Sequence, residues 1–125
     1  MLGEHHPGVA INMTHLSEVL LAQGKPGEAV SLLNAVLAFP VAMLPADHRS
    51  RAGAKSLLGA CLTAQKKYPE AETVLLDAWS AQSKSGTTGR GPARTHQRVL
   101  DLYEAWGRPD KAAAFRRENP LPSRG

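Results

Sequence analysis

The stretch Leu58–Trp79, LGACLTAQKKYPEAETVLLDAW, decides the fold of this chain. Leu58, Cys61 and Leu62 recur about one helical turn apart, which predicts an apolar stripe on an amphipathic helix. Pro69 follows a polar break and stands where the first turn of a helix tolerates proline. A second apolar stripe comes after it, at Ala71, Val74, Leu75, Ala78 and Trp79. Neither helix can bury its stripe alone, so the stretch is predicted to fold as a helical hairpin.

The same unit occurs three times. A turn followed by an alanine appears in AQGKPGEAVSLL, AQKKYPEAETVLL and AWGRPDKAAAFR, which carry Ala29, Ala71 and Ala112 at intervals of 42 and 41 residues. Even spacing of one helical hairpin predicts a stacked solenoid. We expect repeats at about 8–39, 49–83 and 93–118 in a single domain of residues 1–125, with a frayed tail at 119–125.

Proline and glycine set the expected ends of the helices. The six expected helices cover about 8–23, 26–39, 50–65, 69–82, 93–106 and 109–119. Gly24 and Gly107 are expected to end the first and fifth helices in the left-handed conformation. The polar segment 83–91, SKSGTTGRG, is expected to be a loop.

The central hairpin resembles a tetratricopeptide repeat. Leu58-Gly59 matches the Leu-Gly step of that motif, Leu62 its bulky residue, Ala71 the small residue of its second helix, and Ala78 its last alanine. The long period is similar to repeats of the kinesin light chain type and to the arrays of bacterial regulatory proteins, including serine/threonine kinases. The resemblance implies an all-α, right-handed superhelix of three hairpins that acts as a non-enzymatic protein-binding scaffold without a cofactor.

The resemblance also implies where a partner would bind, because the first helix of each hairpin lines the inner surface in this family. Carried over by register, the predicted groove comprises Thr14, His15, Glu18, Ser56, Thr63, Arg94, Gln97, Arg98 and Asp101. The same inward register holds Leu21, Leu57, Ala60 and Glu104. Since Arg94 and Arg98 lie one helical turn apart, both could contact an acidic peptide.

Charge is unevenly distributed along the chain. Residues 84–125 hold nine Lys/Arg and four Asp/Glu, whereas residues 1–83 hold six and seven. A nucleic-acid or anionic-ligand partner for the basic third repeat is therefore the alternative function. No aromatic residue is interleaved with the arginines as base stacking requires, so a solvated terminal face is the favoured interpretation.

Other motifs are weaker. The lone Cys61 lies on an apolar stripe and is interpreted as a small buried residue. The glycines of 86–91 lack the strand and the Gly-Lys-Ser/Thr ending of a phosphate loop. His5, His6 and His48 lack the further ligands of a metal site, and no catalytic set stands out. No membrane span or signal peptide is present, which predicts a cytoplasmic protein.

The lead-in Leu2–Pro7 matches Leu44–His48 at an offset of 42 residues. In a solenoid such a lead-in follows a preceding hairpin, so we expect the chain to be the C-terminal part of a longer array or regulatory protein. The first helix would then expose apolar residues of its stripe, which comprises Ile11, Met13, Leu16 and Leu20. We expect the isolated chain to self-associate through its N-terminal repeat.

Overall fold

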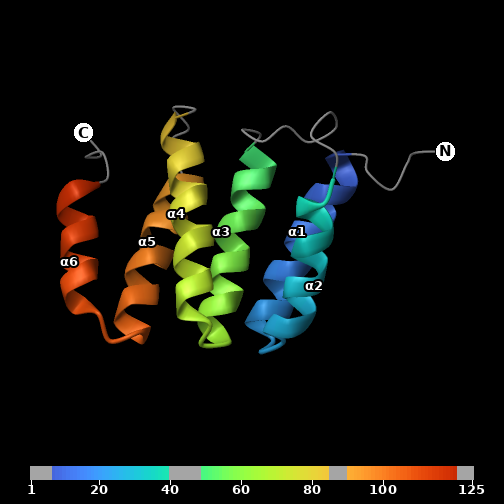
Figure 1. The fold of residues 1–125 in the computed structure, drawn as a ribbon. Helices are drawn as coiled ribbons and strands as arrows, with labels where there is room; N and C mark the ends of the chain where they lie inside the picture. Colours follow the sequence, from blue (N-terminus) through green and yellow to red (C-terminus); the bar gives the residue numbers. More distant parts are fainter. Residues whose placement is uncertain (1–6, 40–48, 85–89, 121–125) are drawn as a thin grey trace.

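The computed structural model describes residues 7–39, 49–84 and 90–120, and this part of the chain contains six helices and no strand. The helices are α1 (Pro7–Ala22), α2 (Pro26–Leu37), α3 (Arg49–Ala64), α4 (Tyr68–Lys84), α5 (Arg90–Ala105) and α6 (Pro109–Glu118). They form three hairpins that stand in a row, with α1 and α2 at one end and α6 at the other (Figure 1). Every predicted helix is present, and each predicted end lies within three residues of the observed one.

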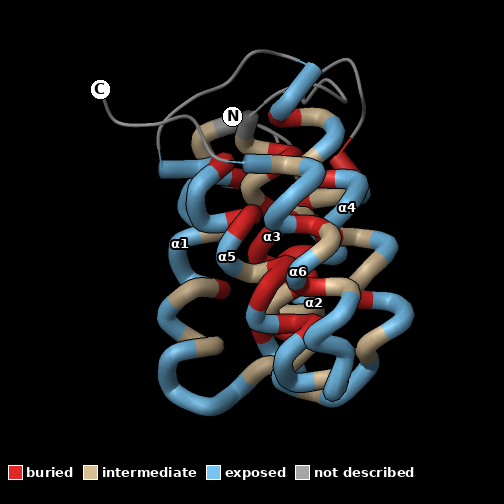
Figure 2. The backbone as a smooth tube through the Cα atoms, turned by 90° about the vertical axis from the view of Figure 1, so that its left-hand side faces the viewer, coloured by how far each residue is buried: buried red, intermediate tan, exposed pale blue. Residues whose placement is uncertain are grey.

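The hairpins form two layers of helices. In the first layer, α3 contacts both α1 and α5, and in chain order each second helix packs against the first helix of the next hairpin. Viewed along the row, α1 and α5 lie on one side and α2 and α4 on the other, with the buried residues between them (Figure 2). The first layer therefore presents one continuous surface on which the candidate site lies.

Three equivalent turns join the helices within the hairpins. Gly24 has φ 79° and Gly107 has φ 75°, which confirms the predicted left-handed ends of α1 and α5. The turn after α3 has the same conformation at Lys66, with φ 64°, although a side chain makes this region unfavourable. All three turns therefore have the same backbone conformation, although the central turn has Lys66 in place of glycine.

Close packing between α3 and α4 explains the Leu-Gly step of the central hairpin. A Cβ atom on Gly59 would lie 2.3 Å from Cγ of Leu75, so only glycine allows this approach. Ala71 is fully buried in the same hairpin. In the first hairpin the residue equivalent to Gly59 is Ser17, which is fully buried. The Ser17 hydroxyl donates to the carbonyl of Met13 at 2.8 Å.

The structure corrects two expectations. The loop predicted at 83–91 is shorter, because α4 extends to Lys84 and α5 begins at Arg90. Asn119, which the sequence places in a frayed tail, is held by two contacts. Its side-chain oxygen accepts from Nε1 of Trp79 at 3.0 Å, and its carbonyl lies 2.8 Å from Nε2 of His96. Residues 121–125 lie outside the described part of the chain.

Candidate functional site

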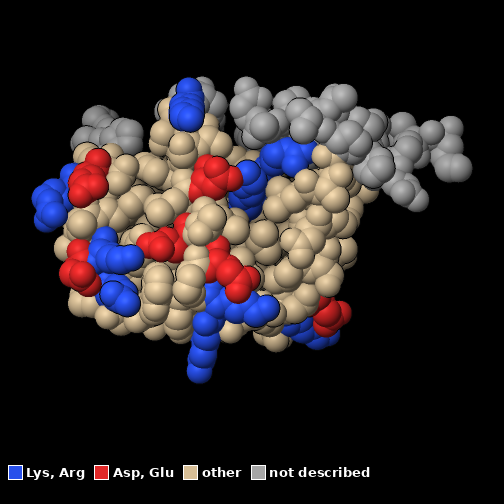
Figure 3. Space-filling view, in the orientation of Figure 1, with Lys and Arg blue, Asp and Glu red and all other residues tan. Residues whose placement is uncertain are grey.

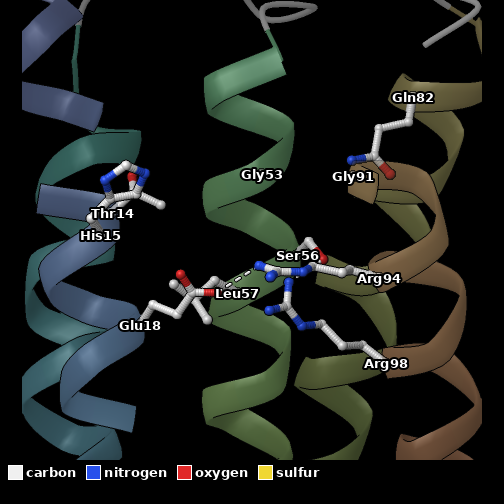
Figure 4. Close-up of a pocket in the computed structure, with 10 residues that line it drawn as sticks. All are labelled: Thr14, His15, Glu18, Gly53, Ser56, Leu57, Gln82, Gly91, Arg94 and Arg98. Carbon is white, nitrogen blue, oxygen red and sulfur yellow. Dashed lines mark hydrogen bonds and ion pairs between the residues drawn. The ribbon is translucent and has the colours of Figure 1, made fainter. Parts of the chain in front are cut away.

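A pocket opens on the first layer of helices, over α3 and between α1 and α5 (Figure 4). Its volume is about 200 Å³. The lining residues are Thr14, His15, Glu18, Gly53, Ser56, Leu57, Gln82, Gly91, Arg94 and Arg98. Six of the nine residues predicted for the groove therefore lie around one hollow, and they come from all three hairpins.

Arg94 and Glu18 form an ion pair across the pocket. Nη1 of Arg94 lies 2.7 Å from Oε2 of Glu18, and the two side chains are about half exposed. The pair joins α5 to α1, which are 76 residues apart in sequence at these positions. Since both groups are solvated, the pair adds little to stability and is exchangeable for another anion.

Arg98 is bound differently, on the inner side of the pocket. Its Nη1 donates to Oγ of Ser56 at 2.8 Å, and the hydroxyl of Thr95 donates to the same oxygen at 2.8 Å. Burial lowers the pKa of the Arg98 guanidinium, and the charge of Arg94 lowers it further, while Glu18 acts in the opposite direction. Among the described residues no carboxylate forms an ion pair with Arg98.

The three remaining predicted groove residues are not brought to the pocket. The hydroxyl of Thr63 donates to the carbonyl of Gly59 on its own helix at 2.9 Å. Gln97 donates to Asp101 at 2.8 Å on an exposed part of α5. The hollow therefore covers only part of the predicted groove, and it does not reach the C-terminal ends of α3 and α5.

Sequence reasoning missed Gly53, Gln82 and Gly91 as lining residues. Gly53 has open space where a Cβ would lie, so its lack of a side chain helps to form the hollow. Gln82, which the sequence gives only as the end of a helix, is buried beside the pocket. Gly91, which the sequence places in a loop, lies in the first turn of α5. The sequence did carry one signal of this hollow, because Gly53 and Gly91 lie near the starts of two first-layer helices, α3 and α5.

Aromatic rings lie beside cationic side chains in the third hairpin. The guanidinium of Arg108 and the ammonium of Lys111 each lie 5.3 Å from the centre of the Trp106 ring. However, the Trp106 ring also stacks with Tyr68 at 5.9 Å and Tyr103 at 6.5 Å. These rings pack on one another and are not free platforms for a base.

Neither a metal site nor a reactive thiol is formed by the described residues. No group of three or more His, Cys, Asp or Glu side chains gathers there, and the predicted loop residues His5, His6 and His48 lie outside this part of the chain. Cys61 is fully buried, and burial raises the pKa of its thiol to about 11, with a smaller opposing effect of Arg98. Its thiol is therefore protonated at neutral pH.

Charged side chains are unevenly placed on the surface as well as in the sequence. On the face seen in Figure 3 they gather over α4, α5 and α6, and the surface over α2 is mostly uncharged. None of the described helices is both long and apolar enough to span a membrane.

Comparison with known proteins gives the fold. No family model matches the sequence, and no curated protein matches it. Among solved structures, the chain is similar to the TPR-like repeats of a putative kinesin light chain from Podosopora anserina, with a TM-score of 0.73 for a substituted form and 0.70 for a second crystal structure, both at 24% identity. The match covers 94% of this chain and 56% of each solved chain, so this chain spans little more than half their length.

These structures confirm the predicted fold. The chain is an all-α solenoid of three helical hairpins, with the fold of the TPR-like repeats in those structures. The first layer of helices, with its pocket, is the surface to which the predicted groove residues were assigned.

Proposed function

We propose that this protein is a non-enzymatic scaffold whose first helix layer binds a protein or peptide segment, with an acidic group of that segment placed between Arg94 and Arg98. The supporting observation is that two arginines one helical turn apart on α5 have different kinds of partner. Arg94 is paired with the exposed Glu18, and Arg98 is bound by the hydroxyl of Ser56. A carboxylate of the peptide would replace Glu18 on Arg94 and give Arg98 the anionic partner that it lacks among the described residues.

The geometry favours one acidic side chain, or a chain end, inside a longer bound segment. The pocket of about 200 Å³ is smaller than a typical small-molecule site, which measures roughly 300–1,000 Å³. A guanidinium binds a carboxylate through parallel hydrogen bonds, which fixes its orientation as well as its charge. His15 and Thr14 border the same hollow from α1 and would contact the neighbouring part of the segment.

The test uses a short fluorescent glutamate-rich peptide and its glutamine counterpart as probes. We expect the parent chain to bind the glutamate peptide more tightly, and the double variant Arg94→Ala/Arg98→Ala to lose this preference. Arg116→Ala/Arg117→Ala is the matched control, because it removes the same charge from two exposed residues of α6. Equal losses in both variants would show that net charge, and not the pocket, attracts the peptide.

Glu18 provides a second test of the same site. Glu18→Gln should release Arg94 and strengthen binding of the glutamate peptide, because the peptide then has no internal competitor. The helical circular dichroism of the variant should equal that of the parent, since the ion pair is solvated. Weaker binding in this variant would place the anion elsewhere on the protein.

Several finer expectations belong to this proposal. Membership of a larger regulatory protein and a cytoplasmic location remain predictions. The nucleic-acid alternative also remains a prediction, and a steep loss of oligonucleotide binding with salt would support it. We favour the peptide because the Trp106 ring, which lies beside cations of the third hairpin, is stacked with Tyr68 and Tyr103.

A further inference from the structure

A second hollow lies on the side of the second helices, where residues of α2, α3 and α4 meet. Its volume is about 500 Å³. The two leucines that α3 contributes to it, Leu58 and Leu62, are each 7% exposed. The full lining is Val30, Asn34, Leu58, Leu62, Lys67, Glu70, Thr73 and Val74. None of these residues lines the peptide pocket, so the hollow is a separate site.

Aromatic rings fill the equivalent space between the second and third hairpins. At the repeat interval of 41 residues, Leu62 corresponds to Tyr103 and Val74 corresponds to Phe115. Both rings are buried, and the Tyr103 ring also stacks with Trp106, with the ring centres 6.5 Å apart. The repeat backbone therefore accepts aromatic rings at this place, and the hollow is the space that remains where the chain has leucine and valine instead.

The charged residues of the hollow complement an aromatic ring that carries a hydrogen-bond donor. Lys67 corresponds to Arg108, whose guanidinium lies 5.3 Å from the centre of the Trp106 ring. An ammonium at this place can make the same cation–π contact with a ring in the hollow. Glu70 brings a carboxylate, which accepts from an N–H or O–H group. Among the described residues, neither Lys67 nor Glu70 takes part in an ion pair.

We propose that this hollow is a binding site for a small aromatic molecule with a hydroxyl or N–H group on its ring, such as a phenol or an indole. The ring packs on Leu58 and Leu62, Lys67 contacts its face, and Glu70 accepts from its donor group. The volume of about 500 Å³ falls within the range of small-molecule sites, roughly 300–1,000 Å³, whereas the peptide pocket lies below it. Apolar side chains with a few polar groups are also the usual lining of such sites.

The experiment titrates the 125-residue chain with p-cresol and follows the methyl signals of its leucines and valines by NMR. We expect the signals of Val30, Leu62 and Val74 to shift, with a dissociation constant of about 1 mM or lower. Two matched probes remove one feature each, since 4-methylcyclohexanol has no aromatic ring and toluene has no hydroxyl. Each should bind at least about threefold more weakly, because the cation–π contact or the hydrogen bond is lost.

Two exposed residues test the assigned contacts without disturbing the core. Lys67→Gln should reduce the preference for p-cresol over 4-methylcyclohexanol, because it removes the cation. Glu70→Ala should reduce the preference for p-cresol over toluene, because it removes the acceptor. Both side chains are exposed, so both variants should keep the helical circular dichroism of the parent.

A further variant fills the hollow from within. Val74→Phe introduces the ring that Phe115 has at the equivalent place and should abolish the binding of p-cresol. Leu76→Phe is the matched control, because Leu76 is 36% exposed on α4 and does not line the hollow. The peptide-pocket variant Arg94→Ala/Arg98→Ala should bind p-cresol as the parent does, so the two proposals can fail separately.

The proposal is overturned if p-cresol at about 5 mM shifts none of the methyl signals of the hollow, or if both matched probes bind as tightly as p-cresol. It is also overturned if a capped Gly-Tyr-Gly peptide binds at least about tenfold more tightly than p-cresol, because the hollow would then take an aromatic side chain of a protein partner. Shifts of the same signals on dilution of the protein alone would overturn it too, because a second copy of the chain would then occupy the hollow.

Discussion

The first junction joins the first and second hairpins, and the second junction joins the second and third. The two junctions share a backbone arrangement but are filled by different side chains. On the side of the second helices, the first junction has a hollow of about 500 Å³. It is lined by Val30, Asn34, Leu58, Leu62, Lys67, Glu70, Thr73 and Val74. The second junction is occupied by rings: Trp79 and Phe115 lie 5.7 Å apart, edge to face, and Tyr68 stacks on Trp106.

The difference follows from substitutions at equivalent positions. Leu62 of the first junction corresponds to Tyr103 of the second, and Val74 corresponds to Phe115. An aromatic ring spans a wider gap than an aliphatic side chain and brings a polar group or a ring-edge contact with it. The repeat backbone therefore accepts either an aliphatic junction that leaves a hollow or an aromatic junction that fills it, and the two should differ in stability.

Removing Trp79 should have the largest effect. Trp79→Ala deletes ring contacts with His96 and Phe115 and the hydrogen bond to Asn119, and we expect a loss of about 3 kcal/mol in the free energy of unfolding. Leu37→Ala is the matched change at the first junction and should cost about 1–2 kcal/mol, because Leu37 is only partly buried.

Urea unfolding followed by circular dichroism measures both losses. A similar cost for the two variants would mean that the rings of the second junction add nothing beyond ordinary apolar burial. If Leu37→Ala cost more, the aliphatic junction would be the stronger one and the comparison would be reversed.

The sequence predicted the framework of the junctions but not how they are filled. Helical periodicity and the spacing of Ala29, Ala71 and Ala112 are local signals, and all three alanines are buried as expected. The ring cluster depends on which residues of different hairpins meet, and periodicity does not carry that information. Asn119 illustrates this limit, since its partners lie 40 and 23 residues earlier in the chain.

The candidate site was predictable to a similar extent. Register placed Arg94 and Arg98 on one face of the fifth helix, and both line the pocket. It did not show that Ser56 binds Arg98 or that Glu18 binds Arg94, because each contact joins two hairpins. It also extended the groove evenly to Thr63, whereas the side chains of the first layer leave one local hollow.

Tyr103→Phe should weaken the second junction by a smaller amount. The phenol donates to Oε2 of Glu72 at 2.8 Å, and the ammonium of Lys111 lies 3.3 Å from the same oxygen. Loss of the hydrogen bond should cost about 1 kcal/mol at neutral pH. The measurement is urea unfolding of the variant and the parent across a pH series.

The pH dependence of this variant has a defined sign. Burial raises the pKa of Tyr103 above its ordinary value of 10.0, and the hydrogen bond to Glu72 raises it further. The stabilisation is complete below about pH 10 and is lost as the pH rises through the elevated pKa, because the unfolded chain ionises first. The deficit of Tyr103→Phe should therefore shrink above about pH 10. A deficit that stays constant with pH would mean that the phenol is not shielded in the folded protein.

The turns offer a comparison in which the central hairpin is the weaker one. Lys66 has φ 64°, where the other two hairpins have Gly24 and Gly107. Lys66→Gly should stabilise the protein by about 0.5–1 kcal/mol, because glycine removes the left-handed strain at a small entropic cost. Gly24→Ala should destabilise it by about 1 kcal/mol, and thermal unfolding measures both. A destabilised Lys66→Gly variant would show that the lysine side chain has a role in this turn.

The last prediction concerns a double variant that gives the first junction two side chains of the second. Val30 and Leu62 correspond to Glu72 and Tyr103, so Val30→Glu/Leu62→Tyr should introduce the second junction's hydrogen bond beside the hollow. Lys67 and Glu70 both line this hollow, and Glu70 stands at the position of Lys111, so the new carboxylate has an anion as well as a cation near it. We expect the pair to change the free energy of unfolding by less than about 0.5 kcal/mol, because ring burial and the hydrogen bond offset the cost of burying polar groups.

Each single change should be unfavourable, since it leaves a buried polar group without its partner. A double-mutant cycle measured by urea unfolding should then give a coupling energy of about 1 kcal/mol between the two positions. Such a coupling would show that the hollow of the first junction is an unfilled version of the aromatic junction. A coupling of zero, with both single variants folded, would show that the two junctions differ in backbone geometry and not only in the side chains that fill them.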